Sequence, residues 1–408
     1  MAYTTQMNKT PSANRVHIAF FGRRNAGKSS LVNAFTGQNL ALVSGVKGTT
    51  TDPVYKAMEL LPLGPVVIID TPGFDDEGEL GKMRVDKARQ VMNKTDAAVL
   101  VLDGEQPADS IFSAAEAEIT AVFSAKNIPF ITVMNKSDIT STDSMGMASS
   151  SEILPVSAKT GFNINILKEK VAAFALGKEP DKRLAADLIQ PLDIVVLVIP
   201  IDKAAPKGRL ILPQQQVIRD ILDTGASAIA VRETELRQTL EKLGAKPSLI
   251  ITDSQVFAQV SAIAPKDIPL TSFSILFARY KGFLETAVEG ASALDNINND
   301  DKILICEGCT HHRQCDDIGT VKIPRLIKGY CLKEPQFDFC SAGDYPDDLS
   351  PYKLIIHCGA CMLNEREMQN RRRLAEEQSI PFTNYGITIA RIQGILEHSI
   401  EIFKQRDI

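Results

Sequence analysis

The sequence lacks the features that would place the chain in a membrane, in the secretory pathway or along a nucleic acid. The opening stretch MAYTTQMNKTPSANR has no apolar run of the kind that a secretory signal needs. The longest apolar stretches, such as IVVLVIPI at 194–201, fall far short of the roughly 20 residues of a spanning helix. Basic residues are not in excess, since the net charge is −5 and the pI is near 5.7. We therefore expect a cytoplasmic protein with no membrane partner and no nucleic-acid partner.

Cysteine is missing from the long N-terminal part of the chain, and all seven cysteines fall between Cys306 and Cys361. An odd number of cysteines without a secretory signal does not favour a disulfide framework. Clustered cysteine and histidine in a reducing compartment more often bind metal. The 408 residues, of which 44% are hydrophobic and 23% charged, suggest two to three globular domains at roughly 150 residues each.

The first motif with clear chemistry is a glycine-rich loop after a short apolar strand. RVHIAFFG at 15–22 is rich in β-branched and aromatic residues, which is typical of a buried strand. It runs into GRRNAGKS, which matches the phosphate-binding pattern G-x-x-x-x-G-K-S from Gly22 to Ser29. The loop amides and the dipole of the next helix favour phosphate. Lys28 would reach the β- and γ-phosphates, and the Ser29 hydroxyl would bind Mg²⁺.

Two further segments predict the parts of a nucleotide switch that sense the γ-phosphate. VVIIDTPGF at 66–74 ends a strand with D-x-x-G, so that Asp70 could hold Mg²⁺ through water and the Gly73 N–H could meet the γ-phosphate. GTTTD at 48–52 lies in the preceding loop, where Thr50 is expected to close on Mg²⁺. Phe74 stands where Ras-like enzymes place a glutamine. Because a phenyl ring cannot orient water, we expect slow intrinsic hydrolysis.

A third motif selects the base. FITVMNKSD at 130–138 ends a strand with N-K-x-D. Asp138 can accept hydrogen bonds from the N1–H and the exocyclic amine of guanine, Asn135 can bind the far edge, and Lys136 can lie over the ring. Adenine offers no such donor pair, so the motif favours GTP over ATP. PVSAKTG at 155–161 would supply the Ala158 N–H to the guanine carbonyl.

The order and the residues of these motifs resemble those of the TrmE–Era–EngA branch of small GTPases. In related GTPases an asparagine at the position of Asn25 helps hold K⁺ against the phosphates, where the cation does the work of an arginine finger. The resemblance implies K⁺-stimulated hydrolysis of GTP to GDP and phosphate, and a solvent-facing or loop-capping asparagine is the alternative. The residues expected at the nucleotide are Gly22, Asn25, Ala26, Gly27, Lys28, Ser29, Ser30, Asn135, Lys136, Asp138, Ser157, Ala158 and Lys159.

The middle of the chain predicts a small α/β domain without chemistry of its own. LGKEPDKR at 176–183 is polar and carries Gly and Pro, so it is the best linker. Strands and helices then alternate, which favours a parallel sheet. We expect this domain to serve dimerisation or spacing. The predicted strands are 193–200, 227–233 and 247–254, the predicted helices are 213–225, 235–245 and 255–263, and the apolar run 270–277 completes the series. The expected domains are 1–178, 184–268 and 269–408.

The last third gathers the cysteines at the ends of two predicted strands. KILICEG at 302–308 leads directly into Cys309-Thr310-His311, and YKLIIHCGAC at 352–361 ends in a second set, His357, Cys358 and Cys361. Because the carboxyl ends of parallel strands share one edge of a sheet, the two segments could meet there. A helix beginning at 362 would direct its N-terminal dipole toward thiolates.

Thiolate ligands favour zinc, Cu(I) or an iron–sulfur cluster. Structural zinc prefers four closed ligands, usually in paired C-x-x-C knuckles. Only the C-x-x-C from Cys358 to Cys361 is unambiguous here, since Cys306, three residues before Cys309, sits inside the strand-to-loop transition. Three cysteines with an incomplete fourth ligand suit a 4Fe–4S cluster with one exchangeable iron. The spacing favours the cluster and leaves zinc, or no metal, as alternatives.

The composite pattern resembles the HydF family, the GTPases of FeFe-hydrogenase maturation. C-x-H, 45 intervening residues and then H-C-x-x-C stand behind an Era-like GTPase and an α/β spacer, so the resemblance covers essentially the whole chain. It implies a 4Fe–4S cluster on Cys309, Cys358 and Cys361, with His311 and His357 as possible ligands or neighbours of the ligands. It also implies a homodimeric scaffold that accepts a diiron subcluster made with two radical-SAM maturases and delivers it to apo FeFe-hydrogenase.

Other features have plainer interpretations. Cys306, Cys315, Cys331 and Cys340 fit no spacing in the family motif and are expected as buried or incidental thiols, although Cys306 or Cys315 could substitute as a ligand. The run RRR at 371–373 is expected on the solvated face of a helix. The rival function is a GTPase of tRNA modification or ribosome assembly with structural zinc, and a third is a structural cluster that reports redox state. The tail HSIEIFKQRDI lacks the C-terminal cysteine motif of the tRNA-modifying relatives.

Overall fold

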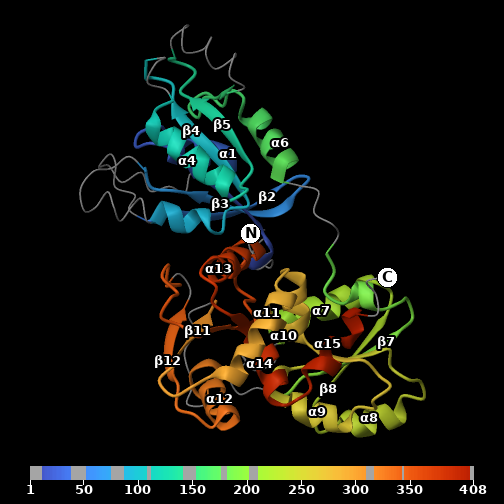
Figure 1. Ribbon diagram of the computed structural model, residues 1–408. Coiled ribbons are helices and arrows are strands. Elements are labelled where there is room, and N and C mark those ends of the chain that lie inside the picture. The colour runs from blue at the N-terminus through green and yellow to red at the C-terminus, as the bar shows by residue number, and fades with distance from the viewer. Residues whose placement is uncertain are drawn as a thin grey trace. The chain divides into compact units, whose positions relative to one another are not determined.

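The computed structural model describes residues 12–37, 52–74, 87–107, 112–140, 153–175, 182–201, 210–308, 317–341 and 344–404 (Figure 1). The chain forms two compact units, Met1–Pro180 and Asp181–Ile408. Four residues expected at the sites, Thr50, Cys309, His311 and Cys315, lie outside the described residues. None of the helices in the described segments has the length and apolar content that a bilayer-spanning helix requires.

The first unit is built on a six-stranded sheet in the order β2-β3-β1-β4-β5-β6. Its strands are β1 (Val16–Phe21), β2 (Val54–Leu60), β3 (Gly64–Asp70), β4 (Ala97–Asp103), β5 (Phe130–Asn135) and β6 (Leu154–Pro155). Only the β2–β3 pair is antiparallel. Phe20 near the end of β1 lies opposite Asp70 at the end of β3, so the loops after these strands leave from one edge.

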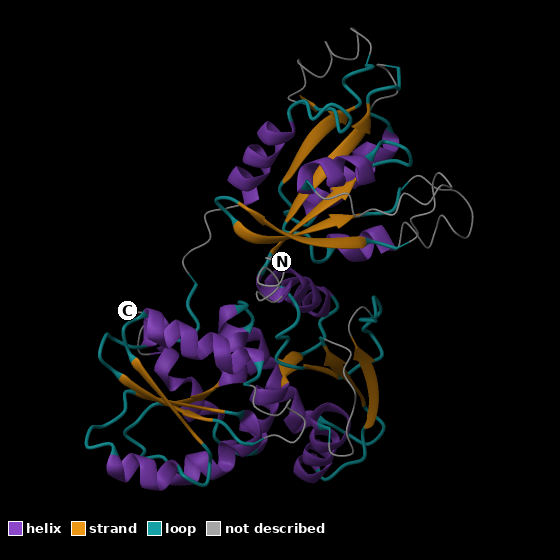
Figure 2. Cartoon of the chain, turned by 180° about the vertical axis from the view of Figure 1, so that it is seen from behind, coloured by secondary structure: helices purple, strands orange, loops and turns teal. Residues whose placement is uncertain are grey.

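Helices cover both faces of this sheet, as Figure 2 shows. The described helices are α1 (Lys28–Thr36), α4 (Ala114–Ala125) and α6 (Ile164–Ala175). Alternate residues of β1 point to opposite faces. Ile18 and Phe20 join α1 and α6 in one apolar core, whereas Ala19 and Phe21 join α4 in another. The two cores hold the sheet rigid beneath the loops at its edge.

The second unit contains two parallel four-stranded sheets. The first has the order β10-β9-β7-β8 and comprises β7 (Ile194–Val198), β8 (Ser227–Val231), β9 (Leu249–Thr252) and β10 (Leu270–Ser272). Its helices are α7 (Leu212–Asp223), α8 (Leu236–Lys242), α9 (Phe257–Ile263) and α10 (Phe273–Tyr280). The apolar run 270–277 therefore divides into a strand and a helix, because Ser272 Oγ accepts a hydrogen bond from the Ile275 N–H at 3.3 Å and caps α10. The sheet extends past residue 268, and the domain boundaries stay predictions.

The other sheet has the order β12-β11-β13-β14 and carries the cysteines. Its strands are β11 (Lys302–Glu307), β12 (Gln336–Ser341), β13 (Leu354–His357) and β14 (Phe382–Asn384), all parallel. Its helices are α11 (Leu284–Ala291), α12 (Ile323–Cys331), α13 (Glu365–Glu377), α14 (Tyr385–Ile392) and α15 (Leu396–Lys404). Short helical turns occupy Ser12–Asn14, Ala186–Leu188, Ser254–Val256, Ser292–Asn296 and Ile318–Lys322.

The two smaller sheets share one apolar core. Helices α10, α11 and α14 lie between them (Figures 1 and 2). Val196 and Ile250 of one sheet and Leu304 and Ile355 of the other belong to the same buried cluster. The predicted fold class, a P-loop sheet followed by two parallel α/β domains, is confirmed.

Candidate functional site

The glycine-rich loop joins β1 to α1 and wraps around its own lysine. Gly27 caps α1 with φ 83°, and a Cβ there would lie 2.3 Å from Asn135 Nδ2, so glycine is required. Lys28 is buried, and its Nζ donates to the backbone oxygens of Gly22 and Arg23, both at 2.8 Å. The ammonium group is thus placed inside the loop, where the phosphates of a nucleotide would lie.

Asn135, at the end of β5, joins the phosphate loop to the base-binding loops. Its side chain is 2% exposed. Nδ2 donates to the Ala26 carbonyl at 3.1 Å, and Oδ1 accepts from the Ala158 N–H at 3.1 Å. The Ala158 N–H, predicted to reach the guanine carbonyl, therefore donates to Asn135 in this structure. One amide side chain fixes the spacing between the two ends of the site.

Asp138, the carboxylate expected to bind the base, is held in its ionised form. Ser157 Oγ donates to Asp138 Oδ1 at 2.7 Å and in turn accepts from the Thr160 N–H at 3.1 Å. The hydrogen bond from Ser157 lowers the pKa of Asp138. Lys136 Nζ lies 2.8 Å from Asp103 Oδ1, so its positive charge is paired beside the loop. An ionised Asp138 can accept two N–H donors, as the guanine edge requires.

The phosphate and base motifs line a single cavity of about 680 Å³. Its walls are Gly27, Ser30, Asn33, Ala34, Gly37, Asn135, Lys136, Asp138, Ile139, Ala158 and Lys159. Seven of these were expected from the motifs. The motifs did not reveal Asn33, Ala34, Gly37 and Ile139, because α1 and the loop after β5 contribute them through packing alone.

Ser29 and Asp70 meet beside this cavity and fit a magnesium ion. The Ser29 hydroxyl hydrogen-bonds the Asp70 carboxyl group. Burial raises the pKa of Asp70, and Ser29, Lys28 and Lys56 oppose that rise. Asp70 Oδ1 is buried without a hydrogen-bond partner among the described residues. An unsatisfied carboxylate oxygen beside a hydroxyl oxygen is a hard donor set, which Mg²⁺ prefers.

Phe74, the residue after Gly73, packs against the apolar core on the α4 face of the sheet. Its ring is therefore engaged in the core. This placement agrees with the expectation that Phe74 does not orient a water molecule.

A turn after β13 presents two thiols at the carboxyl edge of the cysteine-bearing sheet. Cys306 of β11 lies in register with His357, and the Cys358 N–H donates to the Cys306 carbonyl at 2.8 Å. Cys358 Sγ accepts N–H groups from Gly308 at 3.1 Å and Ala360 at 3.3 Å. Such bonds favour the thiolate over the thiol.

The turn is closed tightly, because Ala360 adopts a left-handed conformation with φ 54°. Cys361 follows on the same turn. Burial raises the pKa of Cys361, while the Lys281 ammonium and nearby backbone amides lower it. No three Cys, His, Asp or Glu side chains come together as a metal site within the described ranges, and Cys309 lies outside them.

The buried His357 side chain stabilises this turn through a hydrogen bond to Cys358. The ring is fully buried, Nε2 accepts from Arg371 Nη1 at 3.0 Å, and Nδ1 is 3.0 Å from the Cys358 carbonyl. Because a guanidinium can only donate, Nδ1 carries the proton and donates to Cys358. Burial and the Arg371 charge lower the pKa of His357 to about 3, so the ring is neutral. Both ring nitrogens are engaged with protein groups.

The expectation that 371–373 lies on a solvated face is wrong for Arg371. This side chain is 2% exposed. Glu367, one turn earlier on α13, lies 2.9 Å from its guanidinium, and the Tyr345 ring lies 4.9 Å from the guanidinium carbon. The ion pair and the bond to His357 stabilise the buried charge. Arg372 and Arg373 do pair with glutamates on the surface.

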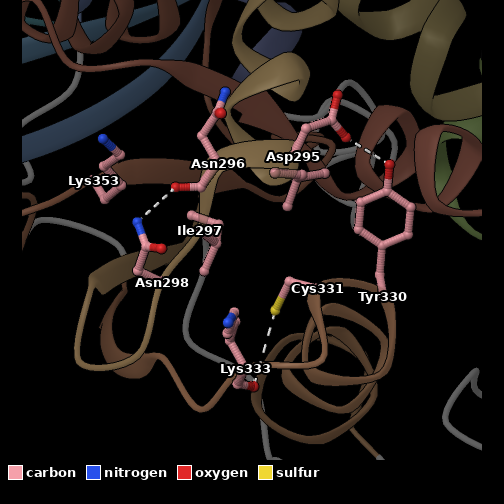
Figure 3. Close-up of a pocket in the computed structure, with 9 residues that line it drawn as sticks. Asp295, Asn296, Ile297, Asn298, Tyr330, Cys331, Lys333 and Lys353 are labelled. Atoms are coloured by element: carbon pink, nitrogen blue, oxygen red, sulfur yellow. Dashed lines mark hydrogen bonds between the residues drawn. The ribbon is translucent and has the colours of Figure 1, made fainter.

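The other described cysteines lie apart from this turn or behind it. Cys306 and Cys340 face each other in register on β11 and β12, and both are buried with their thiols hydrogen-bonded. Cys331 lines a polar pocket of about 740 Å³ (Figure 3). The pocket includes Lys353, which directly precedes β13, whereas Cys358 directly follows β13, so the pocket lies at the opposite end of that strand. Its Sγ is 3.9 Å from the Lys333 carbonyl. The lining residues are Leu294, Asp295, Asn296, Ile297, Asn298, Tyr330, Cys331, Lys333 and Lys353.

The fold and the two sites define a P-loop GTPase joined to two further α/β domains, the last of which carries a cysteine turn. Three protein families match the chain in that order. The 50S ribosome-binding GTPase family matches residues 17–136, the hydrogen maturase F dimerization domain 184–282, and the hydrogen maturase F tetramerization domain 285–402. The chain belongs to the hydrogen maturase F (HydF) family, the GTPases of hydrogenase maturation. The two oligomerisation domains imply an assembly of several copies.

Curated relatives share the GTPase character. The tRNA modification GTPase MnmE of Hamiltonella defensa subsp. Acyrthosiphon pisum is 32% identical over 154 residues, which cover 37% of this chain and 33% of that protein. GTPase Der of Wolinella succinogenes is 33% identical over 179 residues, covering 41% and 37%. The chain thus spans about a third of the length of these relatives. A crystal structure of Era with MgGDPNP and 16S ribosomal RNA is 19% identical, with a TM-score of 0.35, and covers 56% of this chain and 98% of that one.

Proposed function

We propose that the chain is a GTP-hydrolysing scaffold that holds a 4Fe–4S cluster and carries a diiron subcluster to apo FeFe-hydrogenase. One observation carries the proposal. Cys358 and Cys361 lie on a single closed turn at the carboxyl edge of a parallel sheet, and two backbone N–H groups point at Cys358 Sγ. Family membership adds the hydrogenase context.

The donor set fits an iron–sulfur cluster better than a closed zinc site. The turn supplies two soft thiolates, and Cys309 would add a third from the segment after β11, whose end adjoins that of β13. A second C-x-x-C runs from Cys306 to Cys309, but Cys306 lies within β11, where its thiol is fully buried and hydrogen-bonded with Cys340, so it does not complete a closed zinc site. The cluster would supply one iron that is not held by cysteine and can accept another group.

We assign the two histidines different roles at the metal site. Because both nitrogens of His357 are engaged with Arg371 and Cys358, its role is to orient the turn and not to bind iron. His311, two residues after Cys309, belongs to the same C-x-H motif and is proposed as a neighbour of the ligands.

Residues of the P-loop unit bind and hydrolyse GTP in this proposal. Lys28 neutralises the β- and γ-phosphates, Ser29 and Asp70 hold Mg²⁺, and Asp138 selects guanine. Thr50 and Gly73 would report the γ-phosphate to the rest of the unit. GTP acts by binding one conformation more tightly than another, so hydrolysis resets the affinity for partners. The partners proposed are two radical-SAM maturases and apo FeFe-hydrogenase, met in the cytoplasm by a homodimer or larger assembly, with no membrane or nucleic acid involved.

Metal analysis of protein purified without oxygen tests the cluster directly. We expect brown protein with about four iron atoms and four sulfide ions per chain, broad absorbance at about 400 nm and an EPR signal after reduction. Colourless protein that retains one zinc per chain would favour the rival, a GTPase of tRNA modification or ribosome assembly. A cluster that never exchanges a ligand would favour a structural, redox-reporting role.

Hydrolysis is expected to depend on K⁺. Asn25 sits exposed in the glycine-rich loop with φ 64°, so its amide is available to a cation beside the phosphates. We expect turnover in K⁺ to exceed that in Na⁺ by about tenfold or more, as a cation replaces an arginine finger. The Asn25→Ala variant should hydrolyse GTP at the same low rate in both salts. Equal wild-type rates in K⁺ and Na⁺ would contradict the proposal.

A further inference from the structure

A buried lysine from outside the cysteine-bearing sheet reaches the C-x-x-C turn. Lys281 follows α10, near the end of the part that matches the dimerization domain, and is 4% exposed. Its Nζ donates to the carbonyl oxygens of Ala360 and Leu363, the latter at 2.7 Å. These two carbonyls flank Cys361 in the sequence. A single ammonium group therefore holds the turn on both sides of a predicted ligand.

Both ends of Lys281 are fixed. Its N–H donates to the Phe277 carbonyl at 3.0 Å, and its own carbonyl accepts from Gln369 Nε2 of α13. The following residue, Gly282, has φ 69°, and a Cβ there would lie 2.6 Å from the same Gln369 nitrogen. The backbone is thus pressed against α13 while the side chain points into the turn. For the ammonium to turn out to solvent it would have to break its bonds to the Ala360 and Leu363 carbonyls.

An ammonium group buried in this way needs a counterpart. Burial lowers the pKa of Lys281 to about 8, whereas the negative charges of Cys361, Cys358 and Glu365 raise it. Lys182, an exposed lysine, forms its own ion pair with Glu365. Cys361 and Cys358 would balance the Lys281 charge when they are ionised, and a bound anionic cluster would serve in the same way.

We propose that Lys281 is a positioning residue for the iron–sulfur cluster: its ammonium fixes the turn 358–361 through two carbonyls and places a positive charge beside the two thiolates. This inference rests on the proposed function. A fixed positive charge stabilises the more negative, reduced form of a cluster held there, so it raises the reduction potential. Lys281 also ties the α10 end of one maturase domain to the cysteine turn of the other.

The test compares full-length variants purified without oxygen. Lys281→Met keeps the length of the side chain and removes the charge and both hydrogen bonds. We expect it to lose iron to a chelator about tenfold faster than wild type, by analogy with residues that orient metal ligands. Its reduction potential, followed by EPR, should be lower than that of wild type. Lys281→Arg should recover the wild-type potential because it restores the charge.

Lys182→Met is the matched control. It removes a lysine that pairs with Glu365 at the start of α13, but from a partly exposed position without a bond to the turn. Its iron loss and its potential should match wild type. GTP hydrolysis should be unchanged in all these variants, since the P-loop lies in the other compact unit. That rate reports only that the P-loop unit of the purified chains is intact.

The outcomes separate the inference from the proposed function. A wild-type protein that binds no iron would overturn the proposed function and the inference with it. Wild type that holds a cluster, with Lys281→Met showing the same potential and the same iron loss, would overturn the inference alone. If Lys281→Met fails to fold, Lys281→Gln is measured in its place, because the glutamine amide can keep one hydrogen-bond donor to the turn without the charge. A lowered potential then supports the inference, and an unchanged one contradicts it.

Discussion

Replacing Cys358 by serine is expected to remove the iron–sulfur cluster from the purified protein while leaving GTP hydrolysis at the wild-type rate. Cys358 Sγ is the sulfur at which the Gly308 and Ala360 N–H groups converge, and two such donors favour a thiolate ligand. A serine hydroxyl keeps the size but does not ionise near neutral pH and is a poor ligand for iron. Iron per chain and the charge-transfer absorbance should both fall close to background.

The matched control for this experiment is Cys331→Ser. Cys331 has the same chemistry in the same domain, but it lies in the pocket at the opposite end of β13 (Figure 3). Its removal should leave the iron content unchanged. A Cys358→Ser protein that keeps its full complement of iron would contradict the assignment. Loss of iron from both variants would point to general destabilisation and not to a ligand.

Replacing Lys28 by methionine should give the reverse pattern. The Lys28 ammonium is held inside the phosphate loop by the carbonyls of Gly22 and Arg23, and no other described lysine occupies that loop. Methionine keeps the apolar stem and loses the charge that offsets the γ-phosphate in the transition state. We expect kcat/KM for GTP to fall by at least about 100-fold, in line with the loss of one preorganised donor. Steady-state release of phosphate measures the effect.

Iron content should be normal in the Lys28→Met protein, because the P-loop and the cysteine turn lie in different compact units. Lys170→Met, at an exposed position of α6, is the control and should hydrolyse GTP normally. Near-wild-type hydrolysis by Lys28→Met would contradict the assignment of the phosphate loop. A Lys28→Met protein without iron would contradict the independence of the two sites.

The sequence predicted those parts of the molecule that depend on local patterns. The P-loop, D-x-x-G and N-K-x-D segments each follow a strand; P-loop and N-K-x-D residues line one cavity, and Asp70 of D-x-x-G meets Ser29 beside it. The strand predicted at 302–308 is found as β11, because a local apolar run defines it. The run predicted at 352–361 is a strand only over Leu354–His357, and β12, which carries Cys340, was not predicted. Even the division of 270–277 into strand and helix has a local cause, the cap at Ser272.

The residues that sequence reasoning missed act through tertiary contacts that no motif describes. Arg371 looked like part of a solvated basic run, but it is buried because His357 and Glu367 pair with it. Lys281 belongs to no motif, and its partners Ala360 and Leu363 lie about eighty residues further on. The one local signal near it is Gly282, whose left-handed conformation lets the chain pass close to α13. The Lys281 contacts arise from packing between two domains and the Arg371 contacts from packing within one, and composition and periodicity encode neither.

Asn135 shows a third situation, in which a motif residue has a role that its motif does not describe. N-K-x-D assigns this asparagine to the base, whereas its amide also bridges Ala26 in the phosphate loop and Ala158 in the base loop. The bridge depends on Gly27 leaving room for the side chain. The spacing of the two loops in space is thus a tertiary property, although each loop is recognisable on its own.

The proposed scaffold function depends most on which metal, if any, is bound by the sulfur atoms of the C-x-x-C turn. Iron-edge X-ray absorption spectroscopy of oxygen-free wild-type protein, repeated on Cys358→Ser, measures this directly. We predict sulfur neighbours around iron together with short iron–iron distances, both of which disappear in the variant. A spectrum without iron–iron scattering, or a zinc-edge signal from one tetrahedral ion per chain, would contradict the account.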